Sequence, residues 1–348
     1  MIRYDSLLVH YLALELDELL AGAGASTLRL DPASRVAALE TTAGTLVLDL
    51  HPSSGIITLG AAPAAAVVLA LHRRSVVARV TSPADERILT IELAGAPATR
   101  VRRVVVELMG NQWNVLAVDG EDRIVQVLRA REAGGRKLRP GVAYEPPPAS
   151  TRAGLDRPLS IEEWTELLEP LAPAERERAL VANVAWTSPL NAPLILAEPP
   201  AGSGVDALDL ACGTYWYLTG FPPAHPCVLT LPVGEQPYPQ PFPQVAARPT
   251  RSLLEAMALA GGLPAQAPGR SASLLSPELL ERARRRLRVL EARARRLEAQ
   301  GAGAREEALA LRAQADVLLA NLGAMRKGAR RVTLPDFAGG EIEVELDP

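Results

Sequence analysis

The sequence is poor in cysteine and aromatic residues, and it contains no long apolar run. Cys212 and Cys227 are its only cysteines, and two thiols supply neither a disulfide framework nor a zinc-ligand pattern. We therefore expect buried free thiols and no bound metal. No stretch reaches the ~20 apolar residues that span a bilayer, and the first residues lack the apolar core of a signal peptide. These absences predict a cytoplasmic protein without a membrane partner.

Lysine is almost missing as well. Of the 37 basic residues, only Lys137 and Lys327 are lysines. GC-rich coding explains such a bias, although arginine also offers a planar fork of donors that suits phosphate. The net charge of −3 hides an uneven distribution, because residues 72–139 carry thirteen basic against eight acidic side chains. This segment indicates a basic face on an otherwise mildly acidic protein.

Short β-rich segments dominate the first part of the chain. We expect strands over 27–30, 36–40, 45–50, 56–59, 76–80, 88–93, 101–108, 113–118 and 124–129. Helices are expected here only over 5–20 and near 62–73. Because 48% of the residues are hydrophobic but only 4% are aromatic, aliphatic side chains must fill the core. Strands of this length and spacing predict a domain over 1–148 that is similar to a β-sandwich.

Helices become more frequent after the proline run at 146–148. Ser160 and Glu163 have the spacing of a capping box, and helical segments are expected near 161–170 and 174–185. Proline and glycine are common from 186 to 250, where 238–243 is expected to be extended. We assign residues 149–270 to a helical and proline-rich middle region that is similar to a helix-hairpin-helix unit.

The last part of the chain has the strongest helical periodicity. Apolar residues recur at spacings of four and three between 276 and 326, with a glycine break at 301–303. This pattern predicts an antiparallel coiled-coil hairpin over 271–331. Its first arm carries eight arginines between 282 and 296. A β strip over 332–348 follows, and together the elements predict the α+β class.

Several segments, taken in order, resemble one known family. They are HPSS at 51–54, VVVELMG at 104–110, the asparagine at 114, and the segments 139–147, 318–322 and 332–335. Glu107, Gly110 and Asn114 form the structural motif of this set. On these residues the chain resembles the NFACT family, ribosome-associated proteins also called fibronectin-binding protein A, along nearly its whole length.

The resemblance implies both a fold and a function. The family's N-terminal fold is similar to that of bacterial formamidopyrimidine DNA glycosylases. Its best-known members recognise large ribosomal subunits obstructed by peptidyl-tRNA, recruit tRNA and support C-terminal tailing of the stalled chain. We therefore expect a protein without catalysis or cofactor, whose partners are the large ribosomal subunit, rRNA and tRNA. The family's usual C-terminal RNA-binding domain is not recognised here, so a separate protein that supplies it is a further expected partner.

The resemblance also points to site residues. The family's Asp-Arg pair, implicated in tRNA binding, falls on Glu86-Arg87, where the acid is one methylene longer. An exposed ion pair worth ~0–1 kcal/mol is the alternative interpretation. Further candidates for RNA binding are Arg73, Arg74, Arg100, Arg102 and Arg103, together with Arg284, Arg288 and Arg295 of the first coiled-coil arm. Ordinary solvated surface is the alternative for each of these clusters.

Two other functions compete with RNA binding. A nucleic-acid enzyme related to the DNA glycosylases would need their N-terminal proline amine, whereas this sequence begins Met1-Ile2-Arg3. An adhesin, which the fibronectin-binding name suggests, would need export. His51 next to a Pro-Ser-Ser turn does not define a catalytic set, so we favour binding over catalysis.

Overall fold

The computed structural model describes residues 2–61, 64–65, 67–95, 100–110, 113–133, 135–199, 202, 204–262, 331–335 and 341–345. The chain divides into two compact units, one up to residue 271 and one from residue 272. The predicted mixed α+β class is confirmed, whereas the predicted coiled coil over 271–331 lies outside the described residues except at its last position. The described part of the second unit is an antiparallel pair, β16 (Arg331–Pro335) and β17 (Glu341–Glu345).

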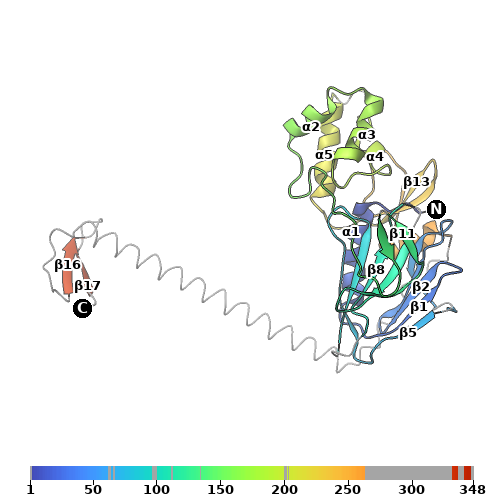
Figure 1. The fold of residues 1–348 in the computed structure, drawn as a ribbon. Coiled ribbons are helices and arrows are strands. Elements are labelled where there is room, and N and C mark those ends of the chain that lie inside the picture. The colour runs from blue at the N-terminus through green and yellow to red at the C-terminus, as the bar shows by residue number, and fades with distance from the viewer. Residues whose placement is uncertain are drawn as a thin grey trace. The chain divides into compact units, whose positions relative to one another are not determined.

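Two five-stranded antiparallel sheets form the centre of the first unit (Figure 1). The first has the order β4-β3-β2-β1-β5, with β1 at Ala25–Asp31, β2 at Val36–Thr41, β3 at Gly44–Asp49, β4 at Ile56–Leu59 and β5 at Val67–Ala70. The second has the order β10-β9-β8-β7-β6, with β6 at Val76–Thr81, β7 at Ile88–Ala94, β8 at Arg103–Glu107, β9 at Asn114–Val118 and β10 at Ile124–Val127. All nine strands expected from the sequence are therefore confirmed, with ends shifted by a few residues.

The prediction of a helix near 62–73 is wrong. Val67–Ala70 is instead the edge strand β5, which pairs antiparallel with β1, from Val67 opposite Leu30 to Ala70 opposite Thr27. The alanines before it favour helix on intrinsic propensity. The open hydrogen-bonding edge of β1 and the two adjacent valines outweigh that propensity, because β-branched residues fit a half-buried pleated surface.

Helix α1 (Ser6–Leu20) lies against both sheets and confirms the helix expected over 5–20. Asp5 caps it, because its Oδ1 accepts a hydrogen bond from the amide of Leu8 at 2.8 Å. Leucines at every fourth position, 8, 12, 16 and 20, are completely buried. They form an apolar stripe that enters the core shared by the two sheets.

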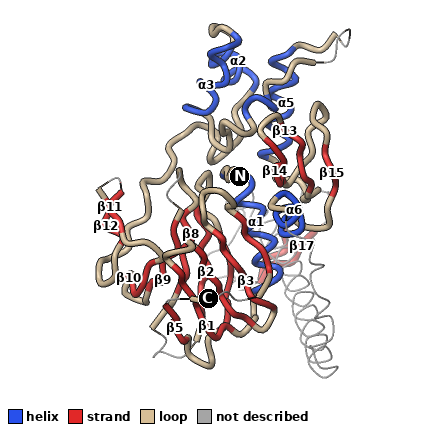
Figure 2. The backbone as a smooth tube through the Cα atoms, turned by 90° about the vertical axis from the view of Figure 1, so that its right-hand side faces the viewer, coloured by secondary structure: helices blue, strands red, loops and turns tan. Residues whose placement is uncertain are grey.

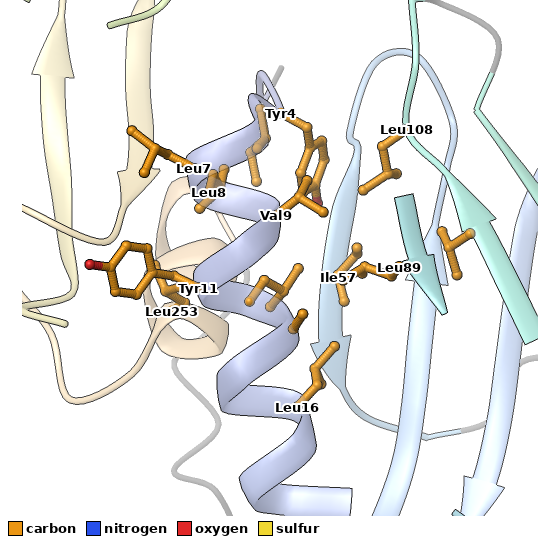
Figure 3. Close-up of a cluster of buried hydrophobic side chains, with 14 of the residues drawn as sticks. Tyr4, Leu7, Leu8, Val9, Tyr11, Leu16, Ile57, Leu89, Leu108 and Leu253 are labelled. Atoms are coloured by element: carbon orange, nitrogen blue, oxygen red, sulfur yellow. The ribbon is translucent and has the colours of Figure 1, made fainter. Parts of the chain in front are cut away.

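The two sides of α1 contact different parts of the unit. On one side, Val9 faces Ile57 and Leu89 of the two sheets (Figure 3). On the other side, Tyr11 lies beside Leu253 of helix α6 (Leu253–Ala260) (Figure 3). The helix is therefore buried between the sheets and residues that come much later in the chain.

The remaining elements of the first unit follow the sheets in sequence. They are β11 (Arg131–Ala133), β12 (Arg136–Leu138), α2 (Ile161–Leu168), α3 (Pro173–Asn183), α4 (Ala192–Ile195), α5 (Ala207–Thr219), β13 (Cys227–Leu231), β14 (Gly234–Tyr238), β15 (Ala247–Pro249) and α6 (Leu253–Ala260). Helices α2 to α5 gather at one end of the unit (Figure 1), whereas α6 lies beside α1 (Figure 2). None of the described helices is long and apolar enough to cross a membrane.

The helices of the middle region were predicted in part. The capping box of α2 is confirmed, since Glu163 Oε2 accepts from the Ser160 amide at 2.8 Å and Ser160 Oγ accepts from the Glu163 amide at 3.3 Å. Helices α4, α5 and α6 were not expected. One buried cluster runs from Ile2 to Met257, so residues on both sides of the predicted boundary at 148 share a core, while the domain boundaries themselves stay predictions.

The start of α6 supplies a test of this long-range packing. The carboxylate of Glu15 on α1 accepts hydrogen bonds from the amides of Leu253 and Leu254, at 2.6 and 3.0 Å. Glu15→Ala leaves these two amides unsatisfied, so we expect the free energy of unfolding to fall by about 1–3 kcal/mol. Glu18→Ala, at an exposed position of the same helix, is the control and should cost less than ~0.5 kcal/mol. Urea unfolding measures both, and equal small losses would contradict a capping role for Glu15.

Candidate functional site

The predicted pair Glu86-Arg87 lies in the loop that joins β6 to β7. The loop turns at Asp85, whose φ of 58° is in the left-handed region. Aspartate tolerates this region better than most residues because its short side chain can hydrogen-bond locally. The turn directs the Asp85 side chain into the protein, where it is fully buried, and leaves Glu86 and Arg87 half-buried.

The Asp85 carboxylate is the centre of a hydrogen-bonded cluster. Arg152 donates to it twice, from Nε to Oδ2 at 2.9 Å and from Nη2 to Oδ1 at 2.5 Å. Ser150 Oγ donates to Oδ2 at 2.6 Å, while Ser6 Oγ and the Trp186 amide donate to Oδ1 at 3.0 and 2.7 Å. We call these five residues the Asp85 cluster. It joins the start of α1, the β6–β7 loop and two segments of the middle region.

Arg152 extends the cluster further into the middle region. Its Nη1 donates to the carbonyl oxygens of Val181 and Thr187, at 2.9 and 2.8 Å. The guanidinium therefore satisfies an ion pair and two backbone acceptors at once. An arginine with its planar fork can do this, whereas a lysine cannot. The segments that surround the β6–β7 loop are held in one arrangement as a result.

A cleft of about 630 Å³ opens beside the Asp85 cluster. We call it the N-terminal cleft. Its walls come from residues 2–6 at the start of α1, 85–87 of the β6–β7 loop, Leu108, Gly110 and Trp113 around the β8–β9 turn, and 187–190 of the middle region. The predicted pair Glu86-Arg87 therefore lines a concave surface and not an open strand end.

The Arg87 carbonyl accepts a hydrogen bond from the Leu108 amide at 2.8 Å, whereas the Arg87 side chain has no hydrogen bond or ion pair with a residue that the structure describes. Glu86 and Arg87 therefore do not form the exposed ion pair of the alternative interpretation. Burial, followed by the nearby Asp85 carboxylate, raises the pKa of Glu86. Burial also raises the pKa of Asp5, which accepts hydrogen bonds from the Leu8 amide, the Ser188 hydroxyl and the Tyr238 hydroxyl. The Arg87 charge only partly opposes the rise in the pKa of Asp5 and of Glu86. The Arg87 guanidinium is thus left available to a ligand in the cleft.

A second arginine, Arg3, reaches the same cleft. Its backbone is held by Gln236, whose Oε1 accepts from the Arg3 amide at 3.0 Å and whose Nε2 donates to the Arg3 carbonyl at 2.9 Å. The Arg3 side chain is exposed and has no hydrogen bond or ion pair with the described residues. Two guanidinium groups in one concave site are a suitable arrangement for a phosphate or another anion.

An aromatic side chain completes the cleft. Trp113 packs edge-on against Tyr4, with ring centroids 5.4 Å apart, and it remains half-buried. Gly55 makes this packing possible, since a Cβ at Gly55 would lie 2.5 Å from the Trp113 ring and its φ is +65°. The Tyr4 hydroxyl donates to the Gly55 carbonyl at 2.9 Å. The indole of Trp113 is therefore held by its neighbours with part of its surface open to the cleft.

The three residues of the predicted structural motif, Glu107, Gly110 and Asn114, lie in two different places. Only Gly110, which is exposed and has a φ of +57°, lines the cleft. Glu107 is buried, and its Oε1 accepts from Arg136 Nη2 at 2.5 Å and from the Tyr144 hydroxyl at 3.1 Å. Asn114 holds the backbone of Arg129 through two hydrogen bonds, at 2.9 and 3.0 Å. Glu107 and Asn114 therefore tie the β8–β9 hairpin to the segments that follow it.

The other arginines predicted to bind RNA lie away from the cleft. Arg73 and Arg74 precede β6, and Arg100, Arg102 and Arg103 precede or begin β8, at the end of the second sheet opposite Arg87. The length of β7 separates the two ends by about 20 Å. Arg103 pairs with Asp122, and Arg102 donates to the Gly95 carbonyl at 3.5 Å. Arg284, Arg288 and Arg295 lie outside the described residues.

The remaining polar candidates do not form a reactive centre. Cys212 and Cys227 are free and buried, as expected, and burial raises the pKa of each thiol to about 11. His51 is exposed and its Nδ1 lies 2.6 Å from Ser53 Oγ within one turn. Within the described ranges, no group of three His, Cys, Asp or Glu side chains could hold a metal ion.

The fold is that of a group of bacterial fibronectin- and fibrinogen-binding proteins. The fibrinogen-binding protein of Staphylococcus aureus superposes with a TM-score of 0.56 at 17% identity, over 73% of this chain and 97% of that structure. The N-terminal part of the fibronectin/fibrinogen-binding protein of Streptococcus suis gives a TM-score of 0.54 at 17% identity, over 74% and 98%. A comparison with curated proteins finds no match.

Residues 72–199 match the model of the family described as NFACT N-terminal and middle domains. This match confirms, over residues 72–199, the resemblance to the NFACT family found in the sequence. The matched segment includes the β6–β7 loop, the β8–β9 turn and most of the Asp85 cluster. Sequence reasoning located Glu86 and Arg87 but missed Arg152, Arg3 and Trp113, because no local pattern connects these residues.

The Asp85 cluster can be tested by its contribution to stability. Asp85→Ala leaves the partly buried guanidinium of Arg152 without its ion pair. We expect the free energy of unfolding to fall by about 3–5 kcal/mol, the usual cost of removing one partner of a buried pair. Arg157→Ala is the control, because it breaks an exposed ion pair with Glu163 that should contribute less than ~1 kcal/mol. Similar losses for both variants in urea unfolding would show that the cluster is no stronger than a surface pair.

Proposed function

We propose that this chain is an RNA-binding protein that uses the N-terminal cleft to hold tRNA on the large ribosomal subunit during the rescue of stalled ribosomes. The observation that carries the proposal is that two arginines, Arg3 and Arg87, line the same cleft. The guanidinium of Arg87 has no hydrogen bond or ion pair with the described residues. The half-buried Trp113 adds an aromatic surface. The match of residues 72–199 to the NFACT family model supports the ribosomal context.

The chemistry of the cleft suits a nucleotide. Guanidinium groups bind phosphate oxygens through charge-assisted hydrogen bonds, and single-stranded bases stack on aromatic side chains or on arginine planes. Glu86 supplies an acceptor for base amino groups or for a ribose hydroxyl. A loop or end of a structured RNA, whose bases are unpaired, therefore fits this site better than a regular duplex does.

The arginines at the far end of the second sheet fit a different role in the same function. Arg73, Arg74 and Arg100 are exposed, and they would contact the phosphate backbone without reading sequence. A separation of about 20 Å from Arg87 lies within the reach of one folded RNA or of rRNA beside a bound tRNA. We propose that they add salt-dependent affinity for the large subunit.

We propose binding without a catalytic step or a cofactor, in the cytoplasm. Two of the three carboxylates that line the cleft support this view, because Asp85 and Asp5 already accept several hydrogen bonds. Asp85 is bound by Arg152, and Asp5 is bound by the α1 backbone and two hydroxyl groups. These hydrogen bonds stabilise the local structure. A carboxylate whose oxygens already accept several hydrogen bonds is a poor general base for a substrate.

A second candidate function is binding of fibrinogen or fibronectin. The names of the two similar solved structures state that activity for those proteins. The shared fold is the observation that favours it here. Immobilised fibrinogen and fibronectin serve as probes, and tight binding that Arg87→Ala does not change would favour this second candidate.

The proposed function predicts a specific effect of Arg87→Ala. The substitution removes a cation from the cleft, so we expect about 1–3 kcal/mol weaker binding of tRNA and a smaller dependence on salt. The free energy of unfolding should change by less than ~0.5 kcal/mol, since the side chain has no described partner. Cosedimentation with purified ribosomal subunits and tRNA at two salt concentrations measures the binding.

Arg79→Ala is the matched control for this experiment. Arg79 is an exposed arginine on β6 that pairs with Glu92 at 2.8 Å, and its loss removes the same charge outside the cleft. Equal effects of the two variants would mean that only net charge matters and that the cleft is not the tRNA site. No binding to large subunits at low salt would refute the ribosomal function itself.

A further inference from the structure

One long segment of this arginine-rich protein has no basic residue except a histidine. Between Arg178 and Arg248 the sequence contains neither lysine nor arginine, whereas Glu198, Asp206, Asp209 and Glu235 are acidic. The segment forms α4, α5, β13 and β14. Phosphate binding depends on lysine and arginine, so the part of this segment that lies outside the N-terminal cleft is poorly suited to binding RNA.

The same segment exposes most of the large hydrophobic side chains on the described surface. All of them except Leu14 and Val68 lie between Val205 and Val233. Tyr217 is 50% exposed and its neighbour Trp216 is 43% exposed. Exposed apolar patches of this kind commonly mark interaction sites, and tyrosine and tryptophan are the side chains that most often anchor protein interfaces.

A groove of about 590 Å³ lies within this surface. One wall is α5, where Asp209, Gly213 and Tyr217 follow each other at intervals of four residues and therefore lie on one face of the helix. The other wall is the segment from Pro241 to Pro243. The Tyr217 hydroxyl donates to Gln240 Oε1 at 3.3 Å, which joins the two walls. We call this site the α5 groove.

Gly213 leaves space in the middle of the α5 groove. A Cβ built at Gly213 would meet no atom within 4 Å. Glycine inside a helix costs about 1 kcal/mol relative to alanine, and no close packing requires it at this position. The glycine therefore widens the groove between the acidic end at Asp209 and the aromatic end at Tyr217.

We propose that the α5 groove docks a short segment of a partner protein. The segment places an apolar side chain over Gly213, packs against Tyr217 and the two prolines, and sets a lysine or arginine opposite Asp209. The volume holds a few side chains and not a folded domain. Charge complementarity favours a basic segment, because acidic side chains are the only charged groups within this stretch of α5. The proposed RNA function does not use this surface.

Selection from a random peptide library displayed on phage tests the proposal with the full chain as the target. Gly213→Leu is the counter-target, because its side chain fills the groove from a position with free space around it. We expect wild-type protein to enrich peptides that combine an apolar residue with a nearby lysine or arginine. A synthetic peptide with the enriched pattern should bind at least about tenfold more weakly to Gly213→Leu and to Asp209→Lys.

Two control variants separate the groove from general effects. Gly213→Ala adds a single methyl group and leaves most of the groove open, and Val68→Lys changes an exposed valine on β5, outside the groove. Both should bind the peptide as the wild type does. Arg87→Ala should also keep peptide binding, so failure of the RNA function and failure of this proposal can be told apart. Circular dichroism confirms that each variant is folded.

Three outcomes would overturn the proposal. The first is that the wild type enriches no peptide over Gly213→Leu. The second is enrichment of acidic peptides, because it contradicts a groove for a basic protein segment. The third is concentration-dependent self-association of the wild type that Gly213→Leu abolishes in sedimentation velocity, which would make a second copy of this chain the occupant.

Discussion

The buried carboxylate of Asp85 is the constraint on which the first unit depends. A charge without access to water is tolerated only where ionic and hydrogen-bonding partners replace its hydration. Asp85 has an ion pair with Arg152 and further donors from Ser6, Ser150 and the Trp186 backbone. Because these donors come from separate segments, the requirements of one carboxylate determine how α1, the β6–β7 loop and the middle region meet.

In this arrangement the residues of the Asp85 cluster fix the walls of the N-terminal cleft, whereas the Arg87 side chain can bind a ligand there. Two positions of one loop that are separated only by Glu86 have opposite roles. Asp85 is fixed by its neighbours, whereas the Arg87 side chain has no hydrogen bond or ion pair with a described residue. The backbone of Arg87 is held by a hydrogen bond from the Leu108 amide, whereas the guanidinium keeps its hydrogen-bond donors for a ligand. A ligand that binds such a guanidinium loses little affinity to reorganisation of the loop, which is the general benefit of preorganisation.

Sequence reasoning reached the elements that local patterns determine. Alternating apolar residues identified the strands of both sheets, and the Ser160–Glu163 spacing identified the start of α2. Helix α5 was missed, because Gly213 and the surrounding prolines favour a loop and tertiary packing outweighs them. Glu86 and Arg87 were located through the family resemblance. Arg152 was not, since its contact with Asp85 joins positions 67 residues apart, and no spacing along the chain reveals such a contact.

The contacts of α1 have a consequence for how the protein is made. Arg3 is bound by Gln236, Asp5 by Tyr238 and Glu15 by the backbone of Leu253, with separations of 233, 233 and 238 residues. During synthesis the first helix therefore leaves the ribosome long before its partners exist. Contacts at such separations form late and slow the folding of a domain. The apolar face of α1 therefore lacks these native partners until almost the entire unit has been translated, and exposed apolar surface of this kind favours aggregation of folding intermediates.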